Sequence, residues 1–307
     1  MTVHRLAEIE DRALGALLGL AVGDALGTTL EFAPRDSYPP LTGMTGGGPF
    51  GLKPGEWTDD TAMALALADS LARPDGFDEQ DLLARFVDWW ENGAYSCTGE
   101  CFDIGIATSQ ALVRWQVSKA PHCGSTAPQT AGNGSLMRLA PVAIRYWNAR
   151  ATLVEVAARQ SKTTHAAPEA VAACAVFADI LADAIEGRPK AEVLRARSEP
   201  YPGAIGAIAS GQWKGKAREE IGSSGYVADT LEAALWCVDR HDGFAQAVLA
   251  AANLGYDADT TAAVTGQLAG ALLGVSAIPQ EWLDCLAWRE QIEQKASLLY
   301  RLGLPQP

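Results

Sequence analysis

Two short clusters of acidic and hydroxyl side chains stand near opposite ends of the chain. The first is Thr58-Asp59-Asp60-Thr61, the second is Asp257-Ala258-Asp259-Thr260-Thr261, and each opens a run of small apolar residues. In each cluster, two carboxylates and a threonine hydroxyl fall within four residues, which concentrates hard oxygen donors in one turn of backbone. Oxygen donors of this kind are the ligands that Mg²⁺ and Mn²⁺ prefer. We therefore expect the two clusters to meet and to hold a pair of such ions.

A simpler role is open to each cluster. Threonine and aspartate are preferred helix N-cap residues, so Thr58 or Asp59 could do no more than start a helix. Two adjacent carboxylates with flanking threonines exceed what a cap needs, and the second cluster repeats that excess. The surplus carboxylates would also offset the unfavourable helix dipole that a bare cation meets at an N-terminus. No set of Cys and His accompanies the clusters, which argues against zinc.

A different kind of site is indicated by Gly132-Asn133-Gly134-Ser135, which precedes an apolar run expected to be helical. Small residues before a helix N-terminus leave backbone N–H groups free to bind a phosphate. The same dipeptides are common in ordinary turns. Both interpretations of this segment are open.

The elements that must position these groups are expected to be helices. Alanine and leucine dominate and β-branched runs are scarce, which predicts an all-α fold. The two clusters must meet across the fold and no linker separates them, so one compact domain over residues 1–307 is expected. The predicted helices cover 7–26, 59–72, 79–92, 103–117, 135–148, 151–161, 167–186, 190–196, 228–239, 243–253 and 259–274, with loops at 118–134 and 199–226.

Glycines recur at four-residue spacing in the first and last of these helices, at 15, 19, 23 and 27 and again at 266, 270 and 274. A glycine inside a helix costs about 1 kcal/mol relative to alanine. Close approach of two helices would justify that cost, and a composition effect in an Ala/Gly/Leu-rich chain is the alternative.

Residues 34–56 form the longest stretch that is dense in proline and glycine. Loops of this length inside a compact domain are uncommon and are often functional lids. Because this segment leads directly into Trp57 and the first acidic cluster, we expect a lid; a surface excursion is the alternative.

The formal net charge of −13 argues against nucleic acid or an anionic membrane as a partner. A phosphate-bearing small molecule stays possible, since two divalent ions would offset four charges locally. The six cysteines form no CxxC pair, which fits idle thiols in a reducing cytoplasm. The first residues are acidic rather than basic and Asp24 interrupts the apolar run, so neither a secretion signal nor a membrane span is expected.

Taken together, the motifs resemble the ADP-ribosylglycohydrolases over residues 11–275. The resemblance rests on several specific segments in the same order: Gly19-Leu-Ala-Val-Gly23-Asp24-Ala-Leu-Gly27 with Glu31, Trp57-Thr-Asp-Asp-Thr61, Phe102-Asp103-Ile-Gly105, Gly132-Asn-Gly-Ser-Leu-Met-Arg138, Thr164-His165, Gly225-Tyr226-Val-Ala-Asp-Thr-Leu and 253–274.

The resemblance implies an all-α fold with a binuclear Mg²⁺/Mn²⁺ centre at the base of a cleft, and removal of ADP-ribose from a modified side chain. It also implies the ligands. One metal would be held by Thr58, Asp59 and Asp60, and the other by Asp257 and Thr260, with Asp259 bridging. The loop from Gly132 through Asn133 and Gly134 to Ser135 would hold the pyrophosphate.

Several further residues acquire possible roles from the resemblance. Glu31 would approach the second metal or the attacking water, and either Glu31 or Asp103 would act as general base or stabilise an oxocarbenium-like transition state. His165 would lie near the substrate, or merely contact backbone at a helix start. Tyr226 would stack on adenine, or serve as a core aromatic. Tyr256 stands where the family often has glycine, so its ring would narrow the cleft or contact the leaving group.

Three functions follow as hypotheses. The first is a metal-dependent hydrolase acting on ADP-ribosylated protein or a small-molecule substrate, with arginine as the first guess for the acceptor. The second is a catalytically inactive ADP-ribose-binding relative. The third is a two-metal nucleotide phosphohydrolase.

Overall fold

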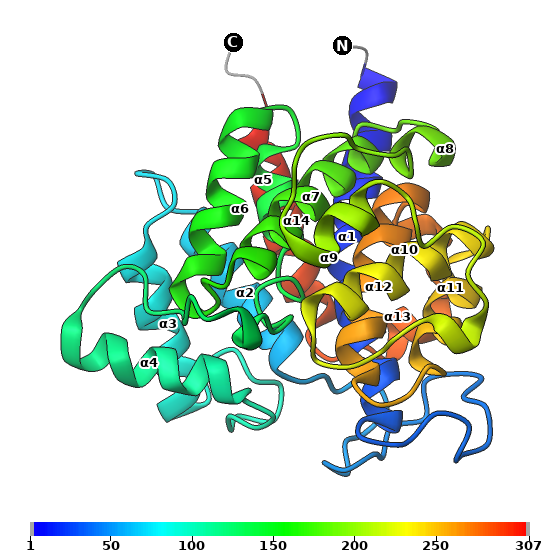
Figure 1. The fold of residues 1–307 in the computed structure, drawn as a ribbon, viewed down its shortest axis with the longest axis horizontal. Helices are drawn as coiled ribbons and strands as arrows, with labels where there is room; N and C mark the ends of the chain where they lie inside the picture. Colours follow the sequence, from blue (N-terminus) through cyan, green and yellow to red (C-terminus); the bar gives the residue numbers. More distant parts are fainter. Residues whose placement is uncertain (1–2, 305–307) are drawn as a thin grey trace.

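The computed structural model describes residues 3–304, and in that range it consists of α-helices and short 3-10 turns without a β-strand (Figure 1). The predicted all-α class is confirmed. The helices are α1 (Val3–Gly27), α2 (Asp59–Leu71), α3 (Glu79–Asn92), α4 (Ile106–Ser118), α5 (Ala140–Tyr146), α6 (Arg150–Thr164), α7 (Pro168–Ile185), α8 (Lys190–Val193), α9 (Gly203–Ala209), α10 (Val227–Arg240), α11 (Phe244–Ala252), α12 (Ala258–Leu273), α13 (Gln280–Cys285) and α14 (Arg289–Gly303).

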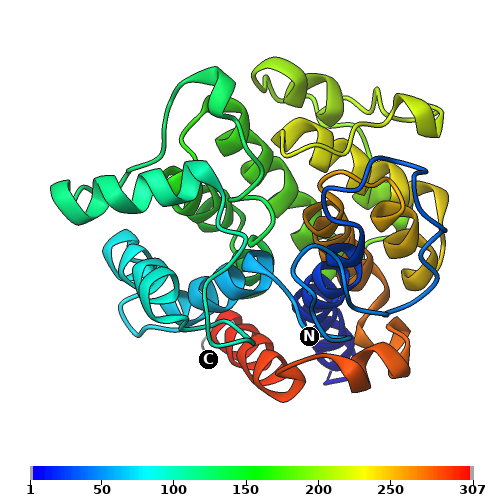
Figure 2. The same ribbon diagram turned by 90° about the horizontal axis from the view of Figure 1, so that it is seen from below.

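Helices α1 and α12 form the centre of the molecule and lie side by side (Figures 1 and 2). A Cβ atom on Gly19 would come within 2.2 Å of the carbonyl oxygen of Gly266, and one on Gly23 within 2.2 Å of that of Ala262. No side chain fits at that separation, so the predicted close approach of the two glycine-bearing helices is confirmed. Composition alone does not explain the spacing.

The remaining helices cover this central pair. Helices α7, α10 and α11 pack against α12, whereas α14 and α2 pack against α1. Helix α5 in turn packs against α14 and α2, and α3 packs against α2. The segment His4–Leu30 is long and apolar enough to cross a membrane by composition, but 89% of its most apolar window is buried inside the structure. A core helix passes the same test, and here the packing of α1 against α12 accounts for its apolar character.

Several predicted boundaries were wrong. The helix predicted at 135–148 begins only at Ala140, because residues 134–138 form turns before Pro141 enters the first turn of α5. The predicted loop 199–226 contains α9, and α13 and α14 lie beyond the last predicted helix. All six cysteines are free, as expected.

Candidate functional site

A cavity of about 580 Å³ opens where the C-terminal end of α1 meets the N-terminal ends of α2 and α12. Five carboxylates line it and none of its lining residues is lysine or arginine. Such a cavity attracts cations or requires them. The lining residues include Glu31, Phe32, Asp59, Asp103, Gly132, Asn133, Gly134, His165, Tyr256, Asp257, Asp259 and Thr260.

The two acidic clusters meet at the base of this cavity, as the sequence predicted. The Thr260 hydroxyl donates to Asp60 Oδ2 at 3.3 Å, which links the start of α12 to the start of α2. The Thr58 hydroxyl lies 3.4 Å from Asp259 Oδ2 and completes a second link. Residues about 200 positions apart in the sequence therefore share one group of oxygen donors.

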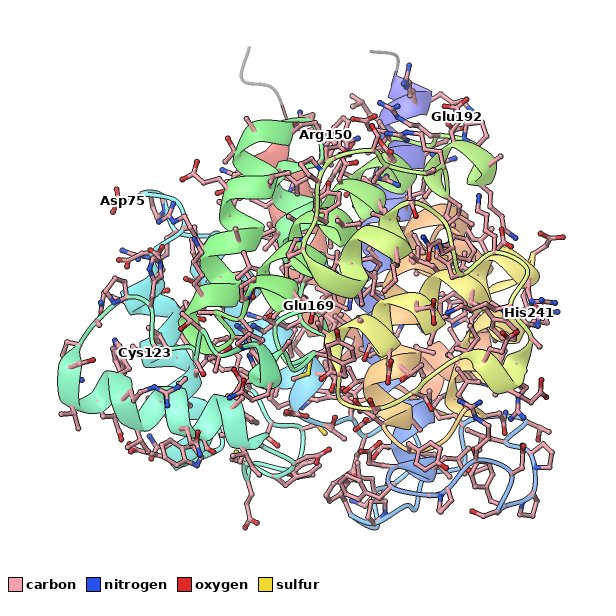
Figure 3. The ribbon with its side chains drawn as sticks, viewed as in Figure 1. Asp75, Cys123, Arg150, Glu169, Glu192 and His241 are labelled. Atoms are coloured by element: carbon pink, nitrogen blue, oxygen red, sulfur yellow. The ribbon has the colours of Figure 1, made fainter. Side chains whose placement is uncertain are left out.

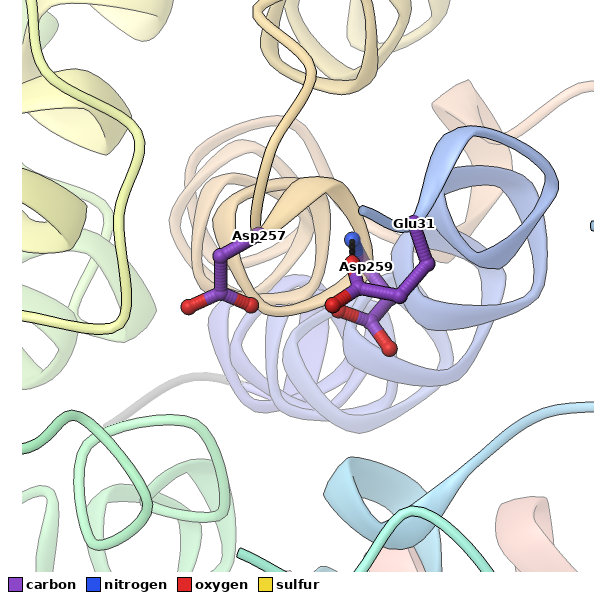
Figure 4. A group of neighbouring side chains, drawn as sticks. All are labelled: Glu31, Asp257 and Asp259. Atoms are coloured by element: carbon purple, nitrogen blue, oxygen red, sulfur yellow. Dashed lines mark hydrogen bonds between the residues drawn. The ribbon is translucent and has the colours of Figure 1, made fainter. Parts of the chain in front are cut away.

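Glu31 is built into the same group. Its Oε2 accepts a hydrogen bond from the backbone N–H of Ala258 at 2.8 Å, with Asp259 N at 3.4 Å, so it caps the N-terminus of α12 from another segment (Figure 4). The residue is only 7% exposed. Carboxylate oxygens of Glu31, Asp257 and Asp259 all lie within 4.8 Å of one another. Glu31 is thus a buried member of the acidic centre and not a solvated loop residue.

The carboxylates destabilise one another's ionised forms. Burial, and then the charge of Asp259, raise the pKa of Glu31 to about 12. Burial raises the pKa of Asp257 and Asp259 to about 7 each, with the charge of Asp259 adding to the first and that of Asp103 to the second. The pKa of Asp60 is raised well above its usual value by burial and by Asp24. A positive charge at this position would relieve that repulsion.

The donor set fits a hard divalent cation. Asp60 Oδ1 is buried and has no hydrogen-bond partner among residues 3–304, although buried acceptors normally have one. The neighbouring donors are carboxylate and hydroxyl oxygens, the ligands that suit Mg²⁺ and Mn²⁺. The acidic cluster can therefore bind a metal ion.

One structural residue of this site was missed as a site residue by the sequence analysis. Asp24 is fully buried in α1, and its two oxygens accept hydrogen bonds from the backbone N–H and the hydroxyl of both Thr58 and Thr61, at 2.6 to 3.0 Å. It fixes the start of α2, and with it the orientation of the first acidic cluster. A lone acid inside the apolar stretch 13–27 of α1 was the signal that could have identified it.

The glycine-rich segment lies beside the second acidic cluster. Asn133 Nδ2 donates to Asp257 Oδ2 at 2.6 Å and to the Thr230 hydroxyl at 2.8 Å. The backbone N–H groups of Gly134 and Ser135 have no hydrogen-bond partner in the described part of the chain. The segment forms a turn rather than the start of a helix, and the Ser135 side chain is buried against the Ser161 hydroxyl at 2.8 Å, away from the cavity lining.

His165 packs against this turn and is held by a buried arginine. Arg138 donates to the Thr164 hydroxyl at 2.9 Å, and the same hydroxyl lies within hydrogen-bond distance of His165 Nδ1, also at 2.9 Å. Nε2 is the ring atom nearest to the position that a Cβ atom on Gly132 would take, at 3.3 Å. Burial lowers the pKa of His165 to about 3, which keeps the ring neutral. Arg138, which also donates to Gly134 O at 3.1 Å, positions both the turn and the imidazole.

Asp103 joins the acidic centre from a fourth segment, the one before α4. It lines the cavity in the left-handed backbone region, at φ 58°, and burial raises its pKa to about 7. Tyr226 is placed differently. Its hydroxyl donates to Glu169 Oε2 at 2.7 Å, and the tyrosine is not among the lining residues (Glu169 is labelled in Figure 3).

The loop 34–56 does not act as the predicted lid in this structure. None of its residues lines the cavity. Arg35 donates to the carbonyl oxygens of Leu254, Arg218 and Ile221 at 2.6 to 2.9 Å, and Asn253 bonds the backbone of Leu41 in both directions. The loop is anchored to the segments before α12, which it braces.

Comparisons with known proteins agree with this geometry. The family model for ADP-ribosylglycohydrolase matches residues 5–306. The chain is 47% identical to ADP-ribosylarginine hydrolase Tri1 of Serratia proteamaculans (strain 568), over 97% of this chain and 81% of that protein. It is 49% identical to the protein of the same name from Pseudomonas putida (strain GB-1), over 94% and 78%. A solved structure titled ADP-ribosylglycohydrolase-related protein complex superposes with a TM-score of 0.87 at 42% identity, covering 97% of this chain and 100% of that one. The match extends the sequence resemblance to include α13 and α14, and the chain belongs to the ADP-ribosylglycohydrolase family.

Proposed function

We propose that this enzyme hydrolyses the bond between ADP-ribose and an arginine side chain, using two Mg²⁺ or Mn²⁺ ions. The observation that carries the proposal is the union of two distant acidic clusters at the base of one cavity, beside a turn with unpaired N–H groups. The choice of arginine is supported by the names of two relatives that are 47% and 49% identical.

In this proposal Thr58, Asp59 and Asp60 hold one ion, while Asp257 and Thr260 hold the other and Asp259 lies between them. When bound, the ions would polarise ribose hydroxyls and lower the pKa of a nearby water. The Thr58 hydroxyl can serve as a metal ligand, because it donates its proton to Asp24 and leaves an oxygen lone pair free for the ion.

The chain's own groups bind the rest of the substrate. The Gly134 N–H group and, with its proton on Nε2, the neutral His165 ring provide donors for the pyrophosphate. Because no lysine or arginine lines the cavity, the turn and the imidazole replace the basic residues that usually bind phosphate. Arg138 keeps both donors in place from behind.

A carboxylate handles the proton of the attacking water. Asp103 suits this role, since burial raises its pKa to about 7 and a base works best near the working pH. Glu31, held by the Ala258 N–H, is the second candidate base. The remaining carboxylates stabilise positive charge that develops on the ribose ring in an oxocarbenium-like transition state.

The test is ADP-ribose release from arginine-linked and serine-linked substrates, with Mg²⁺ or Mn²⁺ and with a chelator. We expect metal-dependent release from the arginine-linked substrate. Release of inorganic phosphate would favour the phosphohydrolase, and tight ADP-ribose binding without release would favour an inactive relative.

The variant Asp259→Asn tests the role of the metal centre. It removes a charge shared by both clusters, so we expect a loss of activity larger than the roughly 10–100-fold typical of residues that only support metal ligands. Circular dichroism should show an intact fold. Asp75→Asn, which neutralises an exposed acid outside the cavity, is the matched control. Turnover by Asp259→Asn near that of the control would contradict a binuclear mechanism.

A further inference from the structure

Two aromatic side chains flank the acidic centre in a strained backbone conformation. Phe32 follows Glu31 and Tyr256 precedes Asp257, and each has φ 60°. Bulky residues rarely adopt this left-handed region, which glycine enters freely. Strain of this kind is concentrated at functional sites.

Burial of the rings does not compensate the strain. Phe32 is 63% exposed and Tyr256 is 50% exposed, and both line the cavity. The backbone of the two residues is nevertheless fixed: Phe32 N donates to Tyr256 O at 2.7 Å, and Tyr256 N donates to Ala33 O at 2.8 Å. This pair of hydrogen bonds holds the two rings at the mouth of one cavity although their residues are far apart in the sequence.

The Phe32 ring has further support on the side of the proline- and glycine-rich loop. Its ring meets that of Phe50 at 6.2 Å with an interplanar angle of 74°, and Phe50 in turn meets Phe102 at 5.3 Å. Phe102 directly precedes Asp103, so the three rings connect the Glu31 segment, the loop and the Asp103 segment. The anchored loop thus braces the aromatic rim rather than covering the cavity.

The chemistry of this rim suits a planar cation. Aromatic faces attract guanidinium groups, and the attraction strengthens where water is displaced. Five carboxylates and no lysine or arginine line the same cavity. A neutral acceptor, such as a serine hydroxyl, gains nothing from either feature.

We propose that Phe32 and Tyr256 bind the guanidinium group of the acceptor arginine and so select arginine-linked over serine-linked ADP-ribose. This inference rests on the proposed hydrolase function. It assigns the aromatic residue that stands in place of the family's usual glycine to recognition of the acceptor.

The first test variant is Tyr256→Gly, with Phe32→Gly as the second. Glycine relieves the positive φ, which offsets the loss of ring contacts, so both variants should fold. We expect KM for an ADP-ribosylarginine peptide to rise on the order of tenfold, as for loss of a desolvated cation–π contact. Agmatine, a free guanidinium compound, should inhibit the wild type and lose its effect on the variants. Tyr256→Phe keeps the aromatic ring face and should therefore keep the KM of the wild type.

The matched control is Lys119→Gly. Lys119 is another non-glycine residue at positive φ, 53°, at the exposed C-terminal end of α4 and outside the cavity lining. Its replacement relieves comparable strain and should leave KM and agmatine inhibition unchanged.

The outcomes separate the two proposals. If the wild type releases no ADP-ribose from the arginine-linked peptide, the proposed function fails. If it does release ADP-ribose, and Tyr256→Gly and Phe32→Gly keep the wild-type KM and agmatine inhibition, the aromatic recognition is overturned while the hydrolase function stands.

Discussion

Asp24 determines how the first acidic cluster is presented, although it does not line the cavity. Its two oxygens accept four hydrogen bonds, from the N–H and hydroxyl of Thr58 and of Thr61. In Asp24→Asn an amide NH₂ would face both the N–H and the hydroxyl of one of these threonines. Leaving a buried donor unsatisfied costs about 1–3 kcal/mol, and the start of α2 should shift.

We therefore expect Asp24→Asn to lower the free energy of unfolding by that amount and to reduce ADP-ribose release as well. Urea denaturation and the release assay measure the two effects. Asp75→Asn, at an exposed position, is the control and should change neither. Unaltered stability and turnover in Asp24→Asn would show that the hydrogen bonds of Asp24 do not position the cluster.

The buried, neutral His165 should make the free energy of unfolding depend on pH. Its pKa is lowered from 6.5 to about 3 by burial and by the charge of Arg138, so the folded protein keeps it neutral while the unfolded chain takes up a proton. Stability due to this residue is complete above pH 6.5 and is lost as the pH falls toward 3, by about 1.4 kcal/mol per pH unit.

The comparison with His165→Asn isolates this contribution, because asparagine does not titrate. Between pH 7.5 and pH 5 the wild type should lose more stability than the variant in urea denaturation. Equal losses in the two proteins would mean that His165 is not buried in its neutral form.

At the residue scale, the sequence was sufficient to predict which carboxylates and which glycine-rich turn come together. Both acidic clusters, Glu31 and the turn from Gly132 were predicted, and the structure brings them to one cavity. Distant segments set the environment of a side chain, so other predicted site residues lie elsewhere. The Ser135 side chain turns away from the cavity, and Tyr226 bonds Glu169 instead of lining the cavity. Asp24 was missed as a site residue because its partners lie 34 and 37 positions away.

At the scale of elements, the contact between α1 and α12 positions the acidic centre. Gly19→Ala places a methyl group 2.2 Å from the carbonyl oxygen of Gly266. The backbone of one of the two helices must move to relieve this clash. Overpacking of this kind costs typically about 1–3 kcal/mol. The start of α12, with its acidic cluster, would shift relative to α2.

We expect Gly19→Ala to lower the melting temperature and to weaken Mn²⁺ binding, measured by calorimetry, although it touches no proposed ligand. Gly43→Ala is the control, because a Cβ there would meet only the Trp282 ring nitrogen at 3.9 Å. A Gly19→Ala protein as stable as Gly43→Ala would contradict the tight approach of the two helices.

Most elements with strong local signals were predicted well, although the 15-residue helix α14 was missed. The helix at 79–92 matches α3, whose N-cap Asp78 accepts from Gln80 N at 2.8 Å, and the glycine spacing correctly indicated the α1–α12 contact. Short or tertiary-stabilised elements were not. Helix α13 has six residues, α9 has seven, and loop 34–56 is fixed by Arg35 through contacts more than 180 residues away in the sequence. Helix propensity and periodicity carry no information on such contacts.

At the scale of the whole molecule, the acidic centre is a place where three regions of the chain repel one another. Glu31 follows α1, Asp60 begins α2 and Asp259 begins α12, and burial together with neighbouring charge raises the pKa of each. A cation that binds the folded state alone stabilises it by about 2.7 kcal/mol at a hundredfold excess over Kd. Since α1, α2 and α12 belong to one core, that stabilisation should extend to the whole structure.

We therefore expect Mg²⁺ or Mn²⁺ at that excess to raise the melting temperature by about 5 °C and a chelator to reverse the rise. The same titration on Asp259→Asn should show most of the shift lost, whereas Asp75→Asn should keep it. A shift of equal size in all three proteins would indicate general screening of the −13 net charge rather than a specific site. A shift confined to proteins with an intact Asp259 would instead mean that the ion binds at the acidic centre. Its positive charge would then offset the repulsion between the two clusters and hold the N-terminal ends of α2 and α12 together.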